Sequence, residues 1–141
     1  MSVADRDALR ARQHAVLDDL LAGLTPPAFD PRGAGLTSRV LHRKRSAGAL
    51  AVAPELAELP GWPDPFLAWS PDNPAVGCAH DDVRAFVASL APNSGWVRLH
   101  EVYDGRRRAA WIQVAGRRMF VIGLGNRVWR LSRHSNKGGL K

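Results

Sequence analysis

The residues with the clearest chemical potential in this 141-residue chain are arginines and tryptophans in its last third. Guanidinium groups form paired hydrogen bonds with carboxylates and phosphates, and they stack on indole rings. Alternate positions of a strand share one face, so Arg127, Trp129 and Arg133 could place an indole between two cations, with Trp111 on a neighbouring strand. The predicted partner-binding residues are Arg106, Arg107, Trp111, Arg117, Arg127, Trp129 and Arg133.

Such a surface could bind an acidic peptide, a phosphate backbone or stacked bases. The alternative is a solvated face whose arginines discourage edge-to-edge aggregation of the sheet. The last strand could also offer an open edge to an extended peptide, or it could pair internally to close a small barrel. The sequence leaves these alternatives open.

The net charge of +7 is unevenly distributed along the chain. Residues 1–94 contain 9 basic and 11 acidic side chains, whereas residues 95–141 contain 11 basic and 2 acidic side chains. Only three of the 20 basic residues are lysines, and alanine, glycine and proline are plentiful, which is typical of a GC-rich genome. Part of the arginine content is therefore compositional, but the asymmetry still predicts an acidic partner for the C-terminal part.

No pattern in the sequence indicates catalysis or a bound metal. The segment Cys78-Ala-His80-Asp81-Asp82 resembles half of a metal site, but metal sites need three or four ligands and no second cluster complements it. Gly123-Leu-Gly125 precedes a predicted strand instead of a helix and lacks the third glycine of a dinucleotide loop. We therefore expect a protein that is not an enzyme and that has no metal and no cofactor.

The first 90 residues have the periodicity of helices. The sequence predicts a first helix over about 3–22, a second that begins at Asp30-Pro31, a short third over 54–59, a helical piece around 66–69 and a fourth over about 81–90. In the second helix we expect the segment His42-Arg-Lys-Arg45 to be exposed. The expected buried stripe of that helix is Leu36, Val40, Leu41, Ala47 and Leu50.

From Trp96 onward the pattern is interpreted as alternation with a period of two. It predicts four strands, joined by turns at Asp104-Gly105, Ala115-Gly116 and Gly125-Asn126. The predicted fold class is α+β, an N-terminal helical bundle followed by a four-stranded antiparallel meander or small half-barrel. The predicted domains are 1–60, a helical domain; 61–80, a Pro- and aromatic-rich connection; 81–134, a helix plus the meander; and 135–141, a flexible tail.

The composition also limits the cellular context. One cysteine excludes an internal disulfide framework, and no apolar run approaches the roughly 20 residues that cross a bilayer. The N-terminus lacks the apolar core of a signal peptide. A soluble, cytoplasmic protein is the expectation.

The helical part carries a resemblance that extends over about two-thirds of the chain. It lies in Leu20-Leu-Ala-Gly23, Pro26-Pro27, Phe29-Asp-Pro31, Arg43-Lys-Arg45 and Pro54-Glu-Leu-Ala57. This pattern resembles the helical N-terminal domain, once described as DNA-binding, of partner proteins of multinuclear non-haem iron oxidative enzymes. Those enzymes act in the biosynthesis of ribosomally made, post-translationally modified peptides. The pattern also resembles a related uncharacterised actinobacterial group.

The resemblance implies a non-catalytic partner that holds a precursor peptide and docks onto an iron enzyme, with the iron ligands in that enzyme. Leader peptides are often acidic, which agrees with the basic C-terminal part. We therefore predict a protein that binds an acidic peptide, docks onto a metal-dependent peptide-modifying enzyme, or does both. The alternative is a DNA- or RNA-binding protein that uses the same basic sheet.

Overall fold

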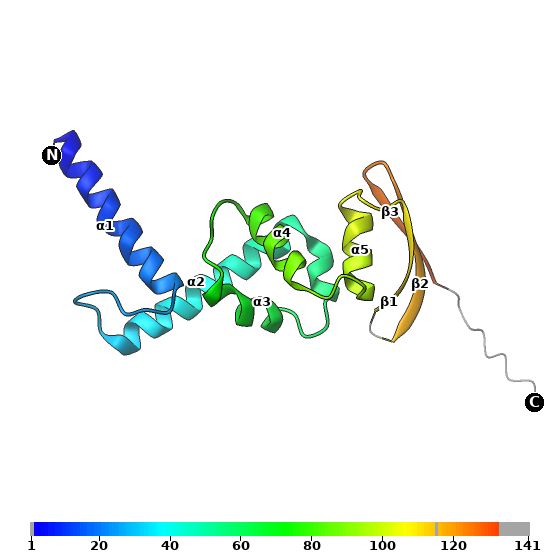
Figure 1. Cartoon of the computed structure of the whole chain (residues 1–141), viewed down its shortest axis with the longest axis horizontal. Helices are drawn as coiled ribbons and strands as arrows, with labels where there is room; N and C mark the ends of the chain where they lie inside the picture. Colours follow the sequence, from blue (N-terminus) through cyan, green and yellow to red (C-terminus); the bar gives the residue numbers. More distant parts are fainter. Residues whose placement is uncertain (1, 115, 133–141) are drawn as a thin grey trace, which may run out of the picture. The chain divides into compact units, whose positions relative to one another are not determined.

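The computed structural model describes residues 2–114 and 116–132. Helices precede a three-stranded antiparallel sheet in a mixed α+β fold (Figure 1). The elements are α1 (Val3–Leu21), α2 (Pro31–Val52), the 3-10 helix η1 (Pro54–Glu58), α3 (Asp64–Trp69), the 3-10 helix η2 (Ser70–Asp72), α4 (Ala79–Ser89), α5 (Gly95–Tyr103), β1 (Ala109–Val114), β2 (Arg117–Leu124) and β3 (Arg127–Ser132). Arg133 and the predicted tail over 135–141 lie outside the described residues.

The contacts divide the chain into two units. The helical unit consists of the residues up to Ala53 together with Pro63–Arg84, and the sheet unit consists of Pro54–Trp62 together with the residues from Ala85 onward. The short helix η1 thus belongs with the sheet, although it follows α2 directly in the sequence.

Both long helices of the helical unit begin where the sequence predicts, and a side chain caps each of them. The hydroxyl of Ser2 accepts a hydrogen bond from the backbone N–H of Asp5, whose carboxylate in turn accepts one from the backbone N–H of Ser2. The carboxylate of Asp30 accepts from the N–H of Gly33, and Pro31 occupies the first position of α2. These two predicted starts are confirmed.

The predicted buried stripe of α2 is wrong. Leu36, Val40 and Ala47 are exposed, and Leu41 and Leu50 are only half-buried. The helix instead buries the opposite face, which consists of Ala34, His42, Ser46 and Ala49. The expected exposure of His42 and Arg45 is wrong for the same reason: polar partners inside the unit hold these two side chains.

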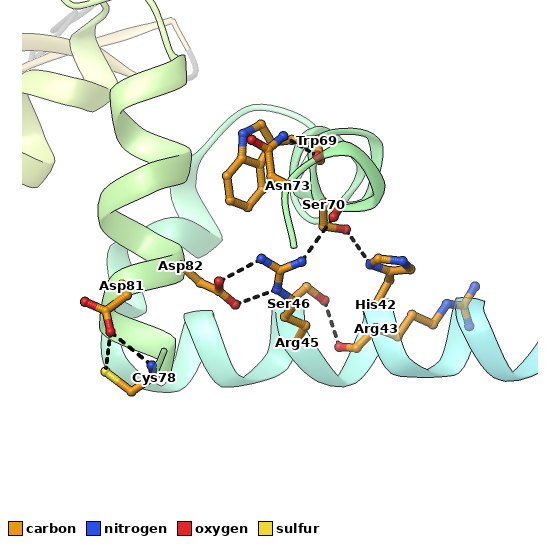
Figure 2. A network of polar contacts seen from close by, with 10 residues as sticks. All are labelled: His42, Arg43, Arg45, Ser46, Trp69, Ser70, Asn73, Cys78, Asp81 and Asp82. Atoms are coloured by element: carbon orange, nitrogen blue, oxygen red, sulfur yellow. Dashed lines mark hydrogen bonds and ion pairs between the residues drawn. The ribbon is translucent and has the colours of Figure 1, made fainter. Parts of the chain in front are cut away.

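Figure 2 shows these partners. Arg45 donates two hydrogen bonds to the carboxylate of Asp82 and a third to the backbone carbonyl of Ser70. The hydroxyl of Ser70 lies 2.8 Å from Nδ1 of His42. The Arg45 guanidinium also lies over the ring of Trp69, 5.5 Å from its centroid. A charged cluster therefore joins α2, α3, η2 and α4 in the interior of the helical unit.

The segment predicted as the first strand is the helix α5, so that prediction is wrong. Ser94 caps it, with its hydroxyl accepting from the N–H of Val97. The residues that α5 buries recur at helical offsets: Trp96, Val97, Leu99, His100 and Val102. Asp104 and Gly105 consequently follow the end of a helix and do not form a hairpin turn.

Contacts between α5 and η1 explain why η1 belongs to the sheet unit. The indole N–H of Trp96 donates to the carbonyl oxygen of Glu55, and Nδ1 of His100 lies 2.6 Å from the Glu55 carboxylate. The rings of Trp96 and His100 are stacked. Glu55 and His100 are both buried, so each is a polar partner for the other where water does not reach.

The sheet is a meander with the order β1-β2-β3, and all neighbours are antiparallel. Over residues 2–114 and 116–132 it contains three strands instead of the predicted four, and β1 and β3 do not pair to close it into a barrel. The predicted turn at Gly125-Asn126 joins β2 to β3, with Gly125 at a φ of 62°, which favours glycine.

In the part of the chain that the structure describes, no helix is long and apolar enough to cross a membrane.

Candidate partner-binding surface

The two faces of the sheet have different environments. The inner face packs against α5 (Figure 1). This face buries Ala110, Ile112 and Val121. Gly123 is on the same face, where an added Cβ would lie 3.2 Å from Val102 of α5. Among the described residues of the sheet unit, no helix covers the other face, which we call the outer face.

Large apolar side chains occupy the outer face. Directly opposed residues of antiparallel strands point to the same side, so the register aligns Trp111, Phe120 and Leu131 in one row and Ile122 with Trp129 in the next. The rings of Trp111 and Phe120 are in contact, with centroids 4.9 Å apart. We call this set the outer-face patch: Trp111, Phe120, Ile122, Leu124, Trp129 and Leu131.

Four of the six members of this patch are exposed to solvent, and Phe120 and Ile122 are half-buried. Trp111 is 62% exposed, Trp129 55% and Leu131 58%. Single exposed apolar residues are ordinary, but a contiguous group across three strands is typical of an interaction site.

Two arginines bound the patch at opposite ends of the strands. Arg118 lies opposite Gln113 at one end, and Arg127 lies opposite Leu124 at the other. Among the described residues, neither arginine forms an ion pair. The sequence has no aspartate or glutamate after Asp104, so the outer face has cations and no anions.

The structure brings together three of the predicted site residues. Trp111, Arg127 and Trp129 share the outer face, as their alternation and register require. Arg117 is an even number of residues from Val121 in β2, so it lies on the inner face of the sheet. Arg133 lies outside the described residues.

Arg106 and Arg107 are not on the sheet. They lie in the loop before β1, where Arg106 pairs with Asp104 and Arg107 pairs with Glu101 of α5, each at 2.7 Å. Their charges are therefore compensated locally, and they do not extend the outer face.

Arg130 has a structural position on the inner face. Its guanidinium pairs with Glu58 of η1 and donates a hydrogen bond to the hydroxyl of Tyr103. The hydrogen bond to Glu58 is the main reason why the pKa of Arg130 is raised. This contact ties β3 to η1 and α5.

Four aliphatic and aromatic members of the patch are not among the predicted site residues. Phe120, Ile122 and Leu124 alternate along β2, and Leu131 is two residues after Trp129. The strand period and the strand register place them beside Trp111 and Trp129. The signal in the sequence is the alternation of Phe120, Ile122 and Leu124 along β2.

Other polar clusters have structural explanations. The thiol of Cys78 donates to Asp81, and the backbone N–H of Cys78 is the main cause of the lowered pKa of Asp81. Asp82 is engaged by Arg45, and no group of three or more potential metal ligands forms among the described residues. The His42–Ser70 pair lies in the interior, where Ser70 has no exposed surface.

The model of the SCO6045-like, C-terminal domain family matches residues 10–92. The chain belongs to this family. It is an uncharacterised family of actinobacterial type. No curated protein and no solved structure matches the chain.

The match covers α2, α3, α4 and most of α1, but it ends before α5 and the sheet. The outer-face patch therefore lies outside the residues that match the family model. The resemblance to partner proteins of iron enzymes stays a prediction.

Proposed function

We propose that this chain is a non-catalytic, cytoplasmic partner protein that binds an acidic segment of another polypeptide through the outer face of its sheet. The observation that carries this proposal is the outer-face patch, a largely exposed apolar surface with an arginine at each end that has no ion-pair partner among the described residues. Burial of the apolar rows would supply most of the affinity, and carboxylates paired with Arg118 and Arg127 would select the partner and fix its register. The resemblance suggests two sources for the segment, a leader peptide or the surface of a metal-dependent peptide-modifying enzyme.

Nucleic acid is the competing ligand class, because exposed aromatic rings beside arginines can stack bases. The composition of the patch favours a polypeptide. Leu124, Ile122 and Leu131 offer no ring for stacking, and the described outer face has only Arg118 and Arg127 to meet a phosphate backbone. An acidic, partly apolar peptide matches this balance better.

Fluorescence anisotropy with the full chain tests the proposal. The probes are a labelled peptide of leucine, alanine and glutamate, the same peptide with lysine in place of glutamate, and a labelled single-stranded oligonucleotide. We expect binding of the acidic peptide only. Trp129→Ala should weaken it about tenfold or more, since central aromatic residues dominate interface energies.

Charge reversal supplies the matched comparison. Arg118→Glu and Arg127→Glu should each weaken binding of the acidic peptide, whereas Arg39→Glu, the same change at an exposed position of α2, should not. Nucleic acid would be the favoured ligand if only the oligonucleotide binds. Its binding constant should then fall by about 0.7 log unit per phosphate contact for each tenfold increase in salt concentration.

A further inference from the structure

The outer-face patch has a definite length along the strands. Arg118 and Leu124 are six residues apart in β2, and Arg127 lies opposite Leu124. With a rise of about 3.3 Å per residue, the two arginine-bearing ends are about 20 Å apart. The apolar rows fill the distance between them.

The sheet offers two places where a polypeptide could bind. One is the outer face, and the other is the free edge of β3, which has no neighbouring strand among the described residues. A strand added at that edge would contact β3 and its side chains Trp129 and Leu131. It would leave Trp111 uncovered, because β1 lies about 10 Å from β3 at the usual strand spacing.

The position of Trp111 therefore distinguishes the two modes. Trp111 packs on Phe120 of the central strand, so the apolar surface runs across all three strands and is not concentrated at the β3 edge. A ligand that buries the whole patch has to lie on the face.

We infer that the ligand of this face is an amphipathic α-helix of the partner, with carboxylates near both of its ends. This inference rests on the proposed function and specifies its ligand. A helix rises 1.5 Å per residue, so a separation of about 20 Å corresponds to about 13 residues. The helix would lie along the strands with its apolar side on the two central rows and its end carboxylates at Arg118 and Arg127, and it would complete a helix–sheet–helix arrangement with α5.

The outer face of a second copy of the chain is not the preferred ligand, because its charges are the same. Two outer faces packed together would bring Arg118 and Arg127 of both copies to one interface without any carboxylate from the strands. A partner helix with acidic ends compensates both cations.

Two labelled peptides of identical leucine, alanine and glutamate composition test the inference with the full chain. In the first, leucines recur at offsets of three and four, and glutamates lie about 13 residues apart. In the second, leucines alternate with the other residues as in a strand. We expect the first peptide to bind at least tenfold more tightly, and to bind more weakly when its glutamates are moved to the middle.

Variants locate the bound peptide. Trp111→Ala and Trp129→Ala should each weaken binding of the helical peptide about tenfold or more, and Val76→Ala, at an exposed position of the helical unit, should have no effect. Trp111→Thr repeats the first test with a residue suited to a strand, in case the alanine variant does not fold.

Each other outcome has a separate meaning. If the alternating peptide binds as well or better, and Trp129→Ala weakens it while Trp111→Ala does not, the ligand is a strand at β3 and the helix inference is wrong, although the proposed function stands. If neither acidic peptide binds, the proposed function itself fails. If the free chain is a dimer by sedimentation and Trp129→Ala dissociates it, a second copy occupies the face and the inference is overturned.

Discussion

Arg45 and Asp82, which are 37 residues apart, are joined by two parallel hydrogen bonds in the interior of the helical unit (Figure 2). The distances are 2.6 Å from Nε to Oδ2 and 2.7 Å from Nη2 to Oδ1, and both side chains are less than 10% exposed. The third donor group of Arg45 is bound by the carbonyl of Ser70. The pair therefore links α2 to α4 with its hydrogen-bonding capacity largely satisfied.

Removal of one partner should be costly. We expect Asp82→Ala to lower the free energy of unfolding by about 3–5 kcal/mol, because it leaves the Arg45 charge buried without a carboxylate. Urea unfolding followed by circular dichroism measures this change. Asp7→Ala is the matched control, since Asp7 faces Arg10 in an exposed pair worth about 0–1 kcal/mol. Equal effects of the two substitutions would contradict the assignment.

Replacement of the whole pair should be milder than removal of Asp82 alone. In Arg45→Met/Asp82→Leu no charge remains unpaired, and apolar replacement of buried ion pairs is often close to neutral. We expect the double variant to be more stable than Asp82→Ala in the same urea experiment. A double variant that is less stable than Asp82→Ala would show that the packing of Arg45 on Trp69 matters more than the charge.

His42 should make the stability of the protein depend on pH. Burial, and secondarily the nearby charge of Arg45, lower the pKa of His42 in the folded state, while the backbone of Leu21 acts in the opposite direction. The unfolded chain therefore binds a proton at higher pH than the folded one, so stability present above about pH 6.5 is lost as the pH falls below it. Thermal unfolding at about pH 7.5 and pH 5.5 should show a larger fall in Tm for the wild type than for His42→Asn. If Tm falls as much in His42→Asn as in the wild type, titratable groups other than His42 cause the pH dependence.

The sequence was informative where the signal is local. The start of α2 follows from Asp30 and Pro31, because a cap acts within one turn. The hairpin at Gly125-Asn126 and the shared face of Trp111 and Trp129 follow from turn chemistry and a period of two. These predictions needed no knowledge of distant residues.

The failures involve distant partners. Nothing near Arg45 indicates that Asp82 neutralises it, so the buried face of α2 could not be chosen from α2 alone. The segment around Leu99 fits a period of two or of 3.6 about equally well over so few residues. Its helical form is favoured by the cap at Ser94 and by the contacts of Trp96 and His100 with Glu55, more than 40 residues away.

Substitution of two glycines by alanine should change the free energy of unfolding in opposite directions. A Cβ at Gly95, the first residue of α5, would collide with the backbone carbonyl of Gln113 in β1, so Gly95→Ala should destabilise the sheet unit. At Gly35, inside α2, the nearest atom is the end of Arg39 at 3.9 Å, so alanine should stabilise the protein by about 0.5–1 kcal/mol through helix propensity. Urea unfolding of both variants measures the two signs. Stabilisation by Gly95→Ala would mean that α5 and β1 can move apart at little cost.

The contact between Glu55 and His100 should hold η1 against α5. Glu55→Ala removes the oxygen that lies 2.6 Å from Nδ1 of His100, so the buried imidazole loses this hydrogen-bonding partner. We expect the free energy of unfolding to fall by about 1–3 kcal/mol. Glu55→Gln keeps a carbonyl oxygen at that place and should lose less. Amide hydrogen exchange measures the local effect: the amides of α5 should exchange faster in the alanine variant, whereas those at the start of α1, in the other unit, should not change. Equal exchange of α5 amides in the alanine variant and the wild type would show that the packing of Trp96, and not the polar contact, holds this helix in place.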